Sequence, residues 1–269
     1  MKFFLIPLIL LTLKLNCGAI TADEIVQRAV EADKKNQELS ETYIYEEKIV
    51  SQVLDKKGNI SKSREKSVLV AAETGISYEF IPGDDGDRLL IAGTTVKTDA
   101  LTSNDIKKSK AKKLKNPVKL YTESMQMQDL AAKYDFALEG EETVNGVATY
   151  RLAFKPKTQK TKAKSKADKV MNHLMGTLWI SKSDYAIVSC SASLAKAVNM
   201  AWFFARIRDV DLHYNAHRLP SGVWMPKDLT LYFNSRSLVF GNYQKQTATM
   251  SGFRVLQKTT PKSTKAKML

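Results

Sequence analysis

Residues 134–154 constrain the fold most strongly, because apolar and polar side chains alternate on both sides of an Asn-Gly pair. Asn145-Gly146 is the preferred dipeptide of a tight two-residue hairpin. The apolar positions that alternate before and after it are Tyr134, Phe136, Leu138, Ala148, Tyr150, Leu152 and Phe154. The segment therefore predicts two antiparallel strands that share one apolar face.

The same rhythm recurs along most of the chain. Strand patterns occupy residues 43–72, 75–92, 178–194, 210–233 and the stretch from 238 onward, and each set is interrupted by a short turn. Residues 182–184 and 220–222 are two of these turns. No helix separates successive strands in a regular βα order. The pattern predicts ten or eleven locally joined strands, hence an α+β protein built on one large, curved antiparallel sheet.

Three amphipathic helices are expected beside this sheet. Thr21 and Glu24 form a capping-box pattern at the start of the first helix, whose apolar stripe is Ile25, Val26, Ala29 and Val30. Residues 119–132 and 166–175 predict two further helices. A sheet of this size must close or cover its apolar face. We therefore expect an incomplete β-barrel with helices covering the concave face.

The N-terminus predicts export. Met1 and Lys2 precede the apolar segment 3–13, and small residues at 17–19 suit a cut after Ala19. This interpretation makes 1–19 a signal peptide, leaves the cap at Thr21 intact and places the mature protein in the periplasm. An alternative is a lipid anchor on Cys17, which Lys14 disfavours because it occupies a position that is usually aliphatic. After the cut Cys190 is the one remaining cysteine, so no internal disulfide is expected.

Eighteen lysines in three stretches carry the net positive charge. They lie in 107–119, in 155–169 and in 258–267, with Asp168 as the one acid among them. Without these nineteen residues, 24 basic and 27 acidic residues remain, so the net charge changes from +14 to −3. The stretches contain no arginine, and a nucleic-acid-binding face is not expected.

The lysine stretches divide the chain into a domain at 20–256, with inserts near 107–119 and 155–169, and a basic disordered tail at 257–269. Two interpretations of the inserts stay open. They are solvated linkers, or they steer the protein to an anionic membrane surface. The residues expected at such a surface are Lys107, Lys108, Lys110, Lys112 and Lys113.

A search for catalytic and metal-binding motifs finds none. The chain contains no phosphate loop, no nucleophile elbow and no paired-cysteine zinc spacing. His213 and His217 are four residues apart, which is about 13 Å along a strand and too far for one metal ion. We therefore expect no enzyme activity, no catalytic residue, no metal and no cofactor.

Residues 198–207 interrupt the alternation with three consecutive aromatic side chains, Trp202, Phe203 and Phe204. One interpretation is a strand buried on both faces, or a short helix that closes one end of the barrel. The other is an apolar loop that lines a ligand cavity or dips into a membrane.

Two segments carry a family resemblance: YDFALEGEETVNGVATYRLAF at 134–154 and GTLWISKSDYAIVSCSASL at 176–194. They resemble the LolA/LolB-type lipoprotein-carrier superfamily, particularly its bacterial outer-membrane lipoprotein-sorting-like proteins, and the resemblance extends in outline over 23–255. It implies an incomplete β-barrel whose hydrophobic concavity, lidded by helices, receives acyl chains. No functional residue is carried over, because the lysine-rich inserts and the greater length depart from the carriers and their tryptophan- and arginine-containing stretches have no counterpart here.

Together these observations predict a monomeric, non-enzymatic periplasmic carrier or binding protein for the acyl chain of a lipid or lipoprotein. The alternative is an envelope sensor or protein-interaction module with the same fold. The sequence leaves the ligand, any partner protein and the direction of transfer open. The residues expected to line the hydrophobic cavity are Phe136, Leu138, Tyr150, Leu152, Leu178, Ile180, Trp202, Phe203, Phe204, Leu229 and Leu231.

Overall fold

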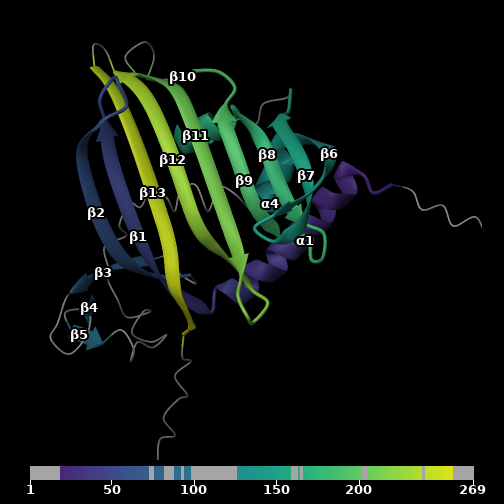
Figure 1. Ribbon diagram of the computed structural model, residues 1–269, viewed down its shortest axis with the longest axis horizontal. Helices are drawn as coiled ribbons and strands as arrows, with labels where there is room; N and C mark the ends of the chain where they lie inside the picture. Colours follow the sequence, from purple (N-terminus) through teal and green to yellow (C-terminus); the bar gives the residue numbers. More distant parts are fainter. Residues whose placement is uncertain are drawn as a thin grey trace, which may run out of the picture.

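One antiparallel sheet dominates the computed structural model (Figure 1). The structure describes residues 19–72, 76–81, 88–91, 94–97, 126–158, 163, 166–201, 205–237 and 240–256. Within these ranges thirteen strands join the sheet. The helices are α1 (Ala22–Ser40), α4 (Met127–Lys133) and α5 (Lys166–Met171). The strands are β1 (Tyr43–Leu54), β2 (Ile60–Ala71), β3 (Ile76–Ile81), β4 (Arg88–Ile91), β5 (Thr94–Lys97), β6 (Tyr134–Val144), β7 (Val147–Pro156), β8 (Leu174–Ser181), β9 (Ile187–Leu194), β10 (Val198–Ala201), β11 (Ala205–Arg218), β12 (Trp224–Ser237) and β13 (Phe240–Val255).

The strand order shows that the sheet is open. It runs β5-β4-β3-β2-β1-β13-β12-β11-β9-β8-β7-β6, with β10 paired to β11, so β5 and β6 lie at opposite ends. Most neighbours are consecutive in sequence and joined by hairpins. The long-range exception is β1 with β13, which pair from Tyr43↔Val255 to Leu54↔Tyr243. The predicted α+β class and large open antiparallel sheet are confirmed.

The tight hairpin predicted at Asn145-Gly146 is also confirmed. Asn145 and Gly146 both have positive φ, 53° and 79°, and the pair Val144↔Val147 closes the turn. Two successive residues with positive φ define the turn whose twist matches that of the flanking strands. Asn and Gly tolerate that backbone, so the local sequence fixes the register of β6 against β7.

Helix α1 begins as its capping box predicts. Thr21 accepts the backbone N–H of Glu24 at 3.2 Å, and the Glu24 carboxylate accepts the backbone N–H of Thr21 at 2.8 Å. The helix buries Ile25, Val26 and Ala29 against the sheet. Figure 1 shows α1 crossing the strand ends near β9 and β11. The cap and the apolar stripe therefore place α1 as a cover over one end of the sheet.

The other two helices are shorter than predicted. The expected helix 119–132 is described only from Gln126, and α4 extends to Lys133; residues 119–125 lie outside the described ranges. The expected helix 166–175 ends at Met171, and Leu174 already belongs to β8, where it pairs with Leu194. The apolar stripe did not reveal this boundary. Its last two positions, Leu174 and Met175, belong to strand β8, which buries Leu174 and exposes Met175.

The hydrophobic core lies on one face of the sheet, which we call the concave face because the helices sit against it. One cluster combines side chains of α1, α4 and α5 with side chains of β1, β2, β6–β9 and β11–β13. The predicted cover of helices on this face is confirmed. Among the described helices, none has the length and apolar character needed to cross a bilayer.

Candidate functional site

The antiparallel register aligns side chains in rows that cross the concave face from β6 to β2. Residues paired directly across neighbouring strands point to the same face. The first row is Phe136, Phe154, Gly176, Ala192, Leu212, Leu231, Gln246, Ser51 and Arg64. The second is Leu138, Leu152, Leu178, Cys190, Tyr214, Leu229, Ala248, Ile49 and Lys66. We call these the first and second cross-strand rows.

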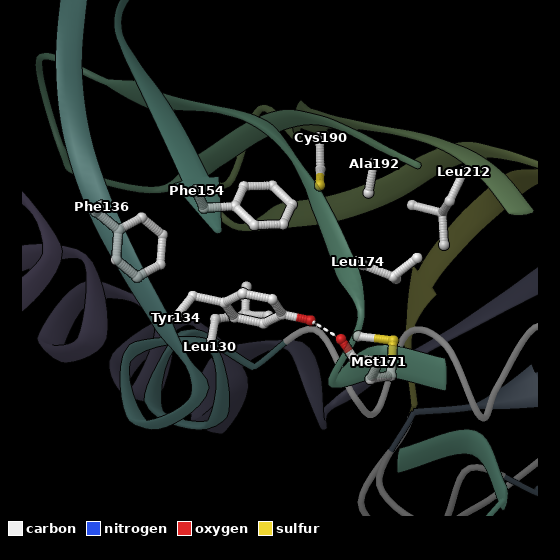
Figure 2. Close-up of a pocket in the computed structure, with 9 residues that line it drawn as sticks. All are labelled: Leu130, Tyr134, Phe136, Phe154, Met171, Leu174, Cys190, Ala192 and Leu212. Carbon is white, nitrogen blue, oxygen red and sulfur yellow. Dashed lines mark hydrogen bonds between the residues drawn. The ribbon is translucent and has the colours of Figure 1, made fainter. Parts of the chain in front are cut away.

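A cavity opens where the apolar part of these rows meets α4 and α5 (Figure 2). Its empty volume is about 350 Å³, including the part that is open to solvent. The lining residues are all uncharged: Leu130, Tyr134, Phe136, Phe154, Met171, Leu174, Cys190, Ala192 and Leu212. The space enclosed by the side chains is itself small. Its uncharged lining suits an apolar chain better than a bulky polar molecule.

Aromatic rings form one wall of the cavity. The ring centroids of Tyr134 and Phe154 are 5.1 Å apart at an interplanar angle of 76°, and Phe136 lies 6.3 Å from Phe154. The Tyr134 hydroxyl donates a hydrogen bond to the backbone carbonyl of Met171, drawn in Figure 2. Burial raises the pKa of Tyr134, so its hydroxyl stays protonated and keeps this donor role. The single polar atom of the wall is therefore satisfied.

Small side chains form the floor. Ala192 and Cys190 project from β9, and Figure 2 shows the Cys190 sulfur directed toward the cavity interior. At Gly176 of β8, an added Cβ would lie 2.0 Å from the carbonyl oxygen of Ser191. Only glycine allows β8 and β9 to approach this closely. Burial raises the pKa of the Cys190 thiol to about 12, which makes it a neutral apolar lining group at physiological pH.

Polar contacts hold the two short helices over the cavity. Lys133, the last residue of α4, forms a 2.8 Å ion pair with Asp168 of α5, and the two side chains are 16% and 21% exposed. Lys157 donates to the carbonyl oxygen of Ala131 at 2.8 Å. Asp33 of α1 accepts the backbone N–H of Met127, the first residue of α4, at 2.8 Å. Together these contacts join α1, α4 and α5 into one cover over the cavity.

The structure brings together some of the residues expected to line a cavity. Phe136 lines it. Six others belong to the same concave core cluster but not to the lining: Tyr150, Leu152, Leu178, Ile180, Leu229 and Leu231. Leu138 shares the second cross-strand row with Leu152, yet it is 37% exposed because β6 is an edge strand. Their role in ligand binding stays a prediction.

Other predicted positions lie outside the described residues. Trp202, Phe203 and Phe204 fall between β10 and the described side chains of β11. The lysines proposed for a membrane surface, Lys107, Lys108, Lys110, Lys112 and Lys113, fall between β5 and α4. The interpretations of both groups therefore stay predictions.

Eight lining residues were absent from the predicted set: Leu130, Tyr134, Phe154, Met171, Leu174, Cys190, Ala192 and Leu212. Tyr134 and Phe154 were available from the alternation that identified Phe136, since all three belong to one hairpin face. Ala192 and Cys190 carry no such signal, because small residues create a hollow only when larger neighbours surround it. The pairing of β9 with β11 supplies those neighbours.

The histidines do not gather around a metal. Within the described ranges, no group of three or more His, Cys, Asp or Glu side chains is placed to hold an ion. His213 Nδ1 lies 3.2 Å from the Ser191 hydroxyl, whereas the His217 ring packs against Phe253 with centroids 5.1 Å apart. A β-bulge at Asn215/Ala216 separates the two histidines.

No family model matches the chain, and no curated protein matches it. Solved structures do. A DUF1329 family protein from Desulfovibrio piger is 14% identical with a TM-score of 0.36, and the match covers 86% of this chain and 92% of that one. A LolA superfamily protein from Nitrosomonas europaea is 11% identical with a TM-score of 0.31, covering 91% and 97%. A Vibrio parahaemolyticus domain described as outer membrane lipoprotein-sorting is 11% identical with a TM-score of 0.35, covering 88% and 95%.

These matches include the superfamily that the sequence resembles. At such identities and TM-scores they transfer no ligand and no functional residue to this chain. The proposals below therefore rest on the cavity and on the cross-strand rows.

Proposed function

We propose that the protein is a non-enzymatic carrier or binding protein that holds an acyl chain of a lipid or lipoprotein in the concave cavity. The observation that carries this proposal is the lining itself. Nine uncharged residues surround the space, and the hydroxyl of Tyr134 is already bonded to Met171. Such a surface offers dispersion contacts and exclusion of water, with no polar group that would orient a polar substrate.

The energetics favour an aliphatic ligand. Burying an acyl chain gains about 0.8 kcal/mol for each CH₂ group. A stretch of ten buried methylenes would therefore gain about 8 kcal/mol before the costs of association are subtracted. The cavity has only a small free volume, so we expect the chain to enter as Met171 and α5 shift outward. Methionine suits this movement because its unbranched side chain adapts to irregular shapes.

We propose further that export delivers the protein to the periplasm, with cleavage after Ala19 and without a lipid anchor on Cys17. The capping box at Thr21 supports a cut before that residue, because it gives the mature chain an intact first helix. The lysine-rich inserts would steer this mature protein toward anionic membrane surfaces. N-terminal sequencing of the secreted protein and its cosedimentation with anionic vesicles at low and high salt test these two points.

Copurified lipid distinguishes a carrier from a partner-only interaction module. The protein is purified as residues 20–269 and extracted with organic solvent, and the extract is analysed by mass spectrometry. A carrier yields an acyl lipid in amounts approaching one per chain. An interaction module that uses the same fold yields none, and it also fails to bind lipid added afterwards.

A cavity-filling substitution provides the specific test. Ala192 is 5% exposed and lines the floor, so Ala192→Phe places a ring where the acyl chain would lie. Ser193→Phe adds the same ring on the opposite face of β9 and is the matched control, because Ser193 is exposed. We expect Ala192→Phe to reduce binding of a fluorescent fatty acid at least tenfold and Ser193→Phe to leave it unchanged. Ala192→Val, a smaller addition, covers the case in which the phenylalanine variant does not fold.

Cys190 supplies an internal reporter for the same test. In residues 20–269 it is the one cysteine, it lines the cavity, and it is 4% exposed. A bound acyl chain should slow its modification by a thiol reagent several-fold. Equal modification rates with and without saturating lipid would place the lipid elsewhere on the protein and reject the cavity as the binding site.

A further inference from the structure

The cross-strand rows end in basic residues on β2. The first row passes from Leu212 through Leu231, Gln246 and Ser51 to Arg64. The second row ends at Lys66, next to Ile49. A third row, Val210, Phe233, Gln244, Val53 and Lys62, ends in the same way. The concave face of β2 therefore reads Lys62, Arg64, Lys66, Val68 and Val70, changing from basic to apolar in a single strand.

The three rows contain no acidic residue. The carboxylate nearest to Arg64 in sequence is Glu65, which points to the opposite, convex face and pairs with Lys48 at 2.8 Å. The convex face of the same strands mixes both signs, with Lys48, Glu65 and Lys245 among its exposed side chains. Lys62 and Arg64 are exposed, and Lys66 is half-buried. Beyond Ile49 and Lys66, the next inward position of β1 is the buried carboxylate Glu47, which pairs with Val68 and Met250. The exposed positive charge on the concave side is thus that of Lys62 and Arg64, at the end of the rows that lies away from the cavity.

The spacing between the cavity and this basic end matches a lipid. Four strand spacings separate Leu212 from Arg64, which is about 19 Å along the sheet. One leaflet of a bilayer, and so the acyl chain of a membrane lipid, spans about 15 Å. A lipid whose chain starts in the cavity and follows the first cross-strand row would bring its headgroup to Gln246, Ser51 and Arg64.

We propose that the basic end of the concave face, formed by Lys62 and Arg64 with Gln244, Gln246 and Ser51, binds the anionic headgroup of the acylated ligand. This inference rests on the proposed function, and it names the ligand class as an acyl lipid with a phosphate or carboxylate headgroup. The Arg64 guanidinium donates two parallel hydrogen bonds to such an anion, a geometry that lysine does not reproduce. The two glutamine amides and the Ser51 hydroxyl add neutral donors beside it.

The test compares two lipids that share one acyl chain. Titration calorimetry of residues 20–269 measures the dissociation constants of a monoacylglycerol phosphate and of the uncharged monoacylglycerol, both below their critical micelle concentrations. We expect the wild type to bind the phosphate lipid about tenfold more tightly, since a hydrogen bond to a charged group is worth about one such factor. Arg64→Gln should reduce this preference to about threefold or less, and Lys62→Gln with Arg64→Gln should abolish it.

Lys245→Gln is the matched control, because it removes one positive charge from the convex face of β13 in the same part of the sheet. It should keep the tenfold preference, and the unchanged affinity of every variant for the neutral lipid shows that the cavity is intact. Equal binding of both lipids by the wild type overturns the headgroup site while leaving the acyl-binding function standing. Binding of neither lipid rejects both. Displacement of the phosphate lipid by an equal concentration of inorganic phosphate would show a free-anion site, and would also overturn the proposal.

Discussion

The two parts of the concave face obey the same alternation but carry different chemistry. In the covered part, β6 to β9 and the adjoining β11, inward positions are apolar and nearly all lie beneath α1, α4 and α5. In the open part, residues 50–54, 60–66 and 241–247 of β1, β2 and β13, the inward positions of the three rows are Ser51, Gln244, Gln246, Lys62, Arg64 and Lys66, with Val53 as the apolar exception. The first cross-strand row shows the transition directly, since Leu231 is 6% exposed whereas Arg64 is exposed to solvent.

The comparison shows that two separate influences are at work. One decides which face of the sheet a side chain points to, and the other decides whether that face is apolar. Hydrogen bonding between strands fixes which side chains share a face along the whole length of each strand. Whether that face must be apolar depends on what lies over it, because only surface removed from water gains hydrophobic free energy. The helices cover part of the sheet, so one continuous face is apolar at one end and basic at the other, as the proposed acyl and headgroup sites require.

The largest expected contrast between the two parts concerns their glycines. At Gly176, in the covered part, an added Cβ meets the backbone of Ser191 and Ala192 at 2.0 and 2.8 Å. At Gly241, in the open part, it meets only the Tyr243 ring, at 3.3 Å. We expect Gly176→Ala to cost about 3 kcal/mol, because β8 and β9 must separate and disturb a packed core. Gly241→Ala should be neutral or stabilise by about 0.5 kcal/mol, because it restricts the unfolded chain.

Urea denaturation of the two alanine variants measures both effects. The Cys190 modification rate should also rise in Gly176→Ala, because the floor of the cavity lies between the strands that separate. Equal free energies of unfolding for the two variants would show that the close approach of β8 and β9 does not contribute to stability. The covered and open parts would then not differ in their tolerance of an added Cβ.

A matched pair of valines sharpens the comparison within one row. Val210 and Val53 both face inward in the third cross-strand row; Val210 is 1% exposed, whereas Val53 is half-buried. Val210→Ala should cost about 2 kcal/mol, from two lost methylene equivalents and the small cavity left behind. Val53→Ala should cost less than about 1 kcal/mol, since its site is partly hydrated already. If both variants lose the same free energy, the open part is as well covered as the core.

Local signals were enough to predict most of the sheet. The Asn145-Gly146 turn, the alternation on either side of it and the Thr21–Glu24 capping box each depend on residues close in sequence, and each is confirmed. The pairing of β1 with β13 joins residues about two hundred positions apart. Nothing in either strand specifies its partner, because many exposed polar strands could pair with similar backbone bonds.

The candidate site was harder to predict than the fold, because it depends both on the cross-strand rows and on the helices that cover them. Alternation identified Phe136 as inward-facing, but the neighbours of Phe136 come from β7, β9 and β11, and the lid comes from α4 and α5. The end of α5 at Met171 was misplaced because Leu174 continues a helical stripe while belonging to β8. In the sequence, Lys62, Arg64 and Lys66 of β2 look like ordinary residues of an exposed strand. Only their pairing with Val53, Ser51 and Ile49 shows that they lie on the same face as the core.

The smallest expected effect concerns the contact that ties the covers of the cavity together. Asp33 of α1 accepts the backbone N–H of Met127 in α4 at 2.8 Å, and burial raises the pKa of Asp33 above its ordinary value of 3.8. The folded protein therefore holds this proton to a higher pH than the unfolded chain does. The contribution of Asp33 to the free energy of unfolding should fall as the pH rises from about 3.8 through the raised pKa, and then level off.

Asp33→Asn removes this dependence while keeping an oxygen acceptor for Met127. Urea denaturation between pH 3.5 and 7.5 should show the variant gaining stability relative to the wild type as the pH rises, by a modest amount that is complete above the raised pKa. Asp33→Leu, which leaves the Met127 N–H without its acceptor, should instead be less stable than the wild type at every pH. A constant difference between Asp33→Asn and the wild type would show that folding leaves the pKa of Asp33 unchanged. Because Asp33 holds its proton to a higher pH when α1 and α4 are docked than in the unfolded chain, the stability of the cavity cover is expected to depend on pH.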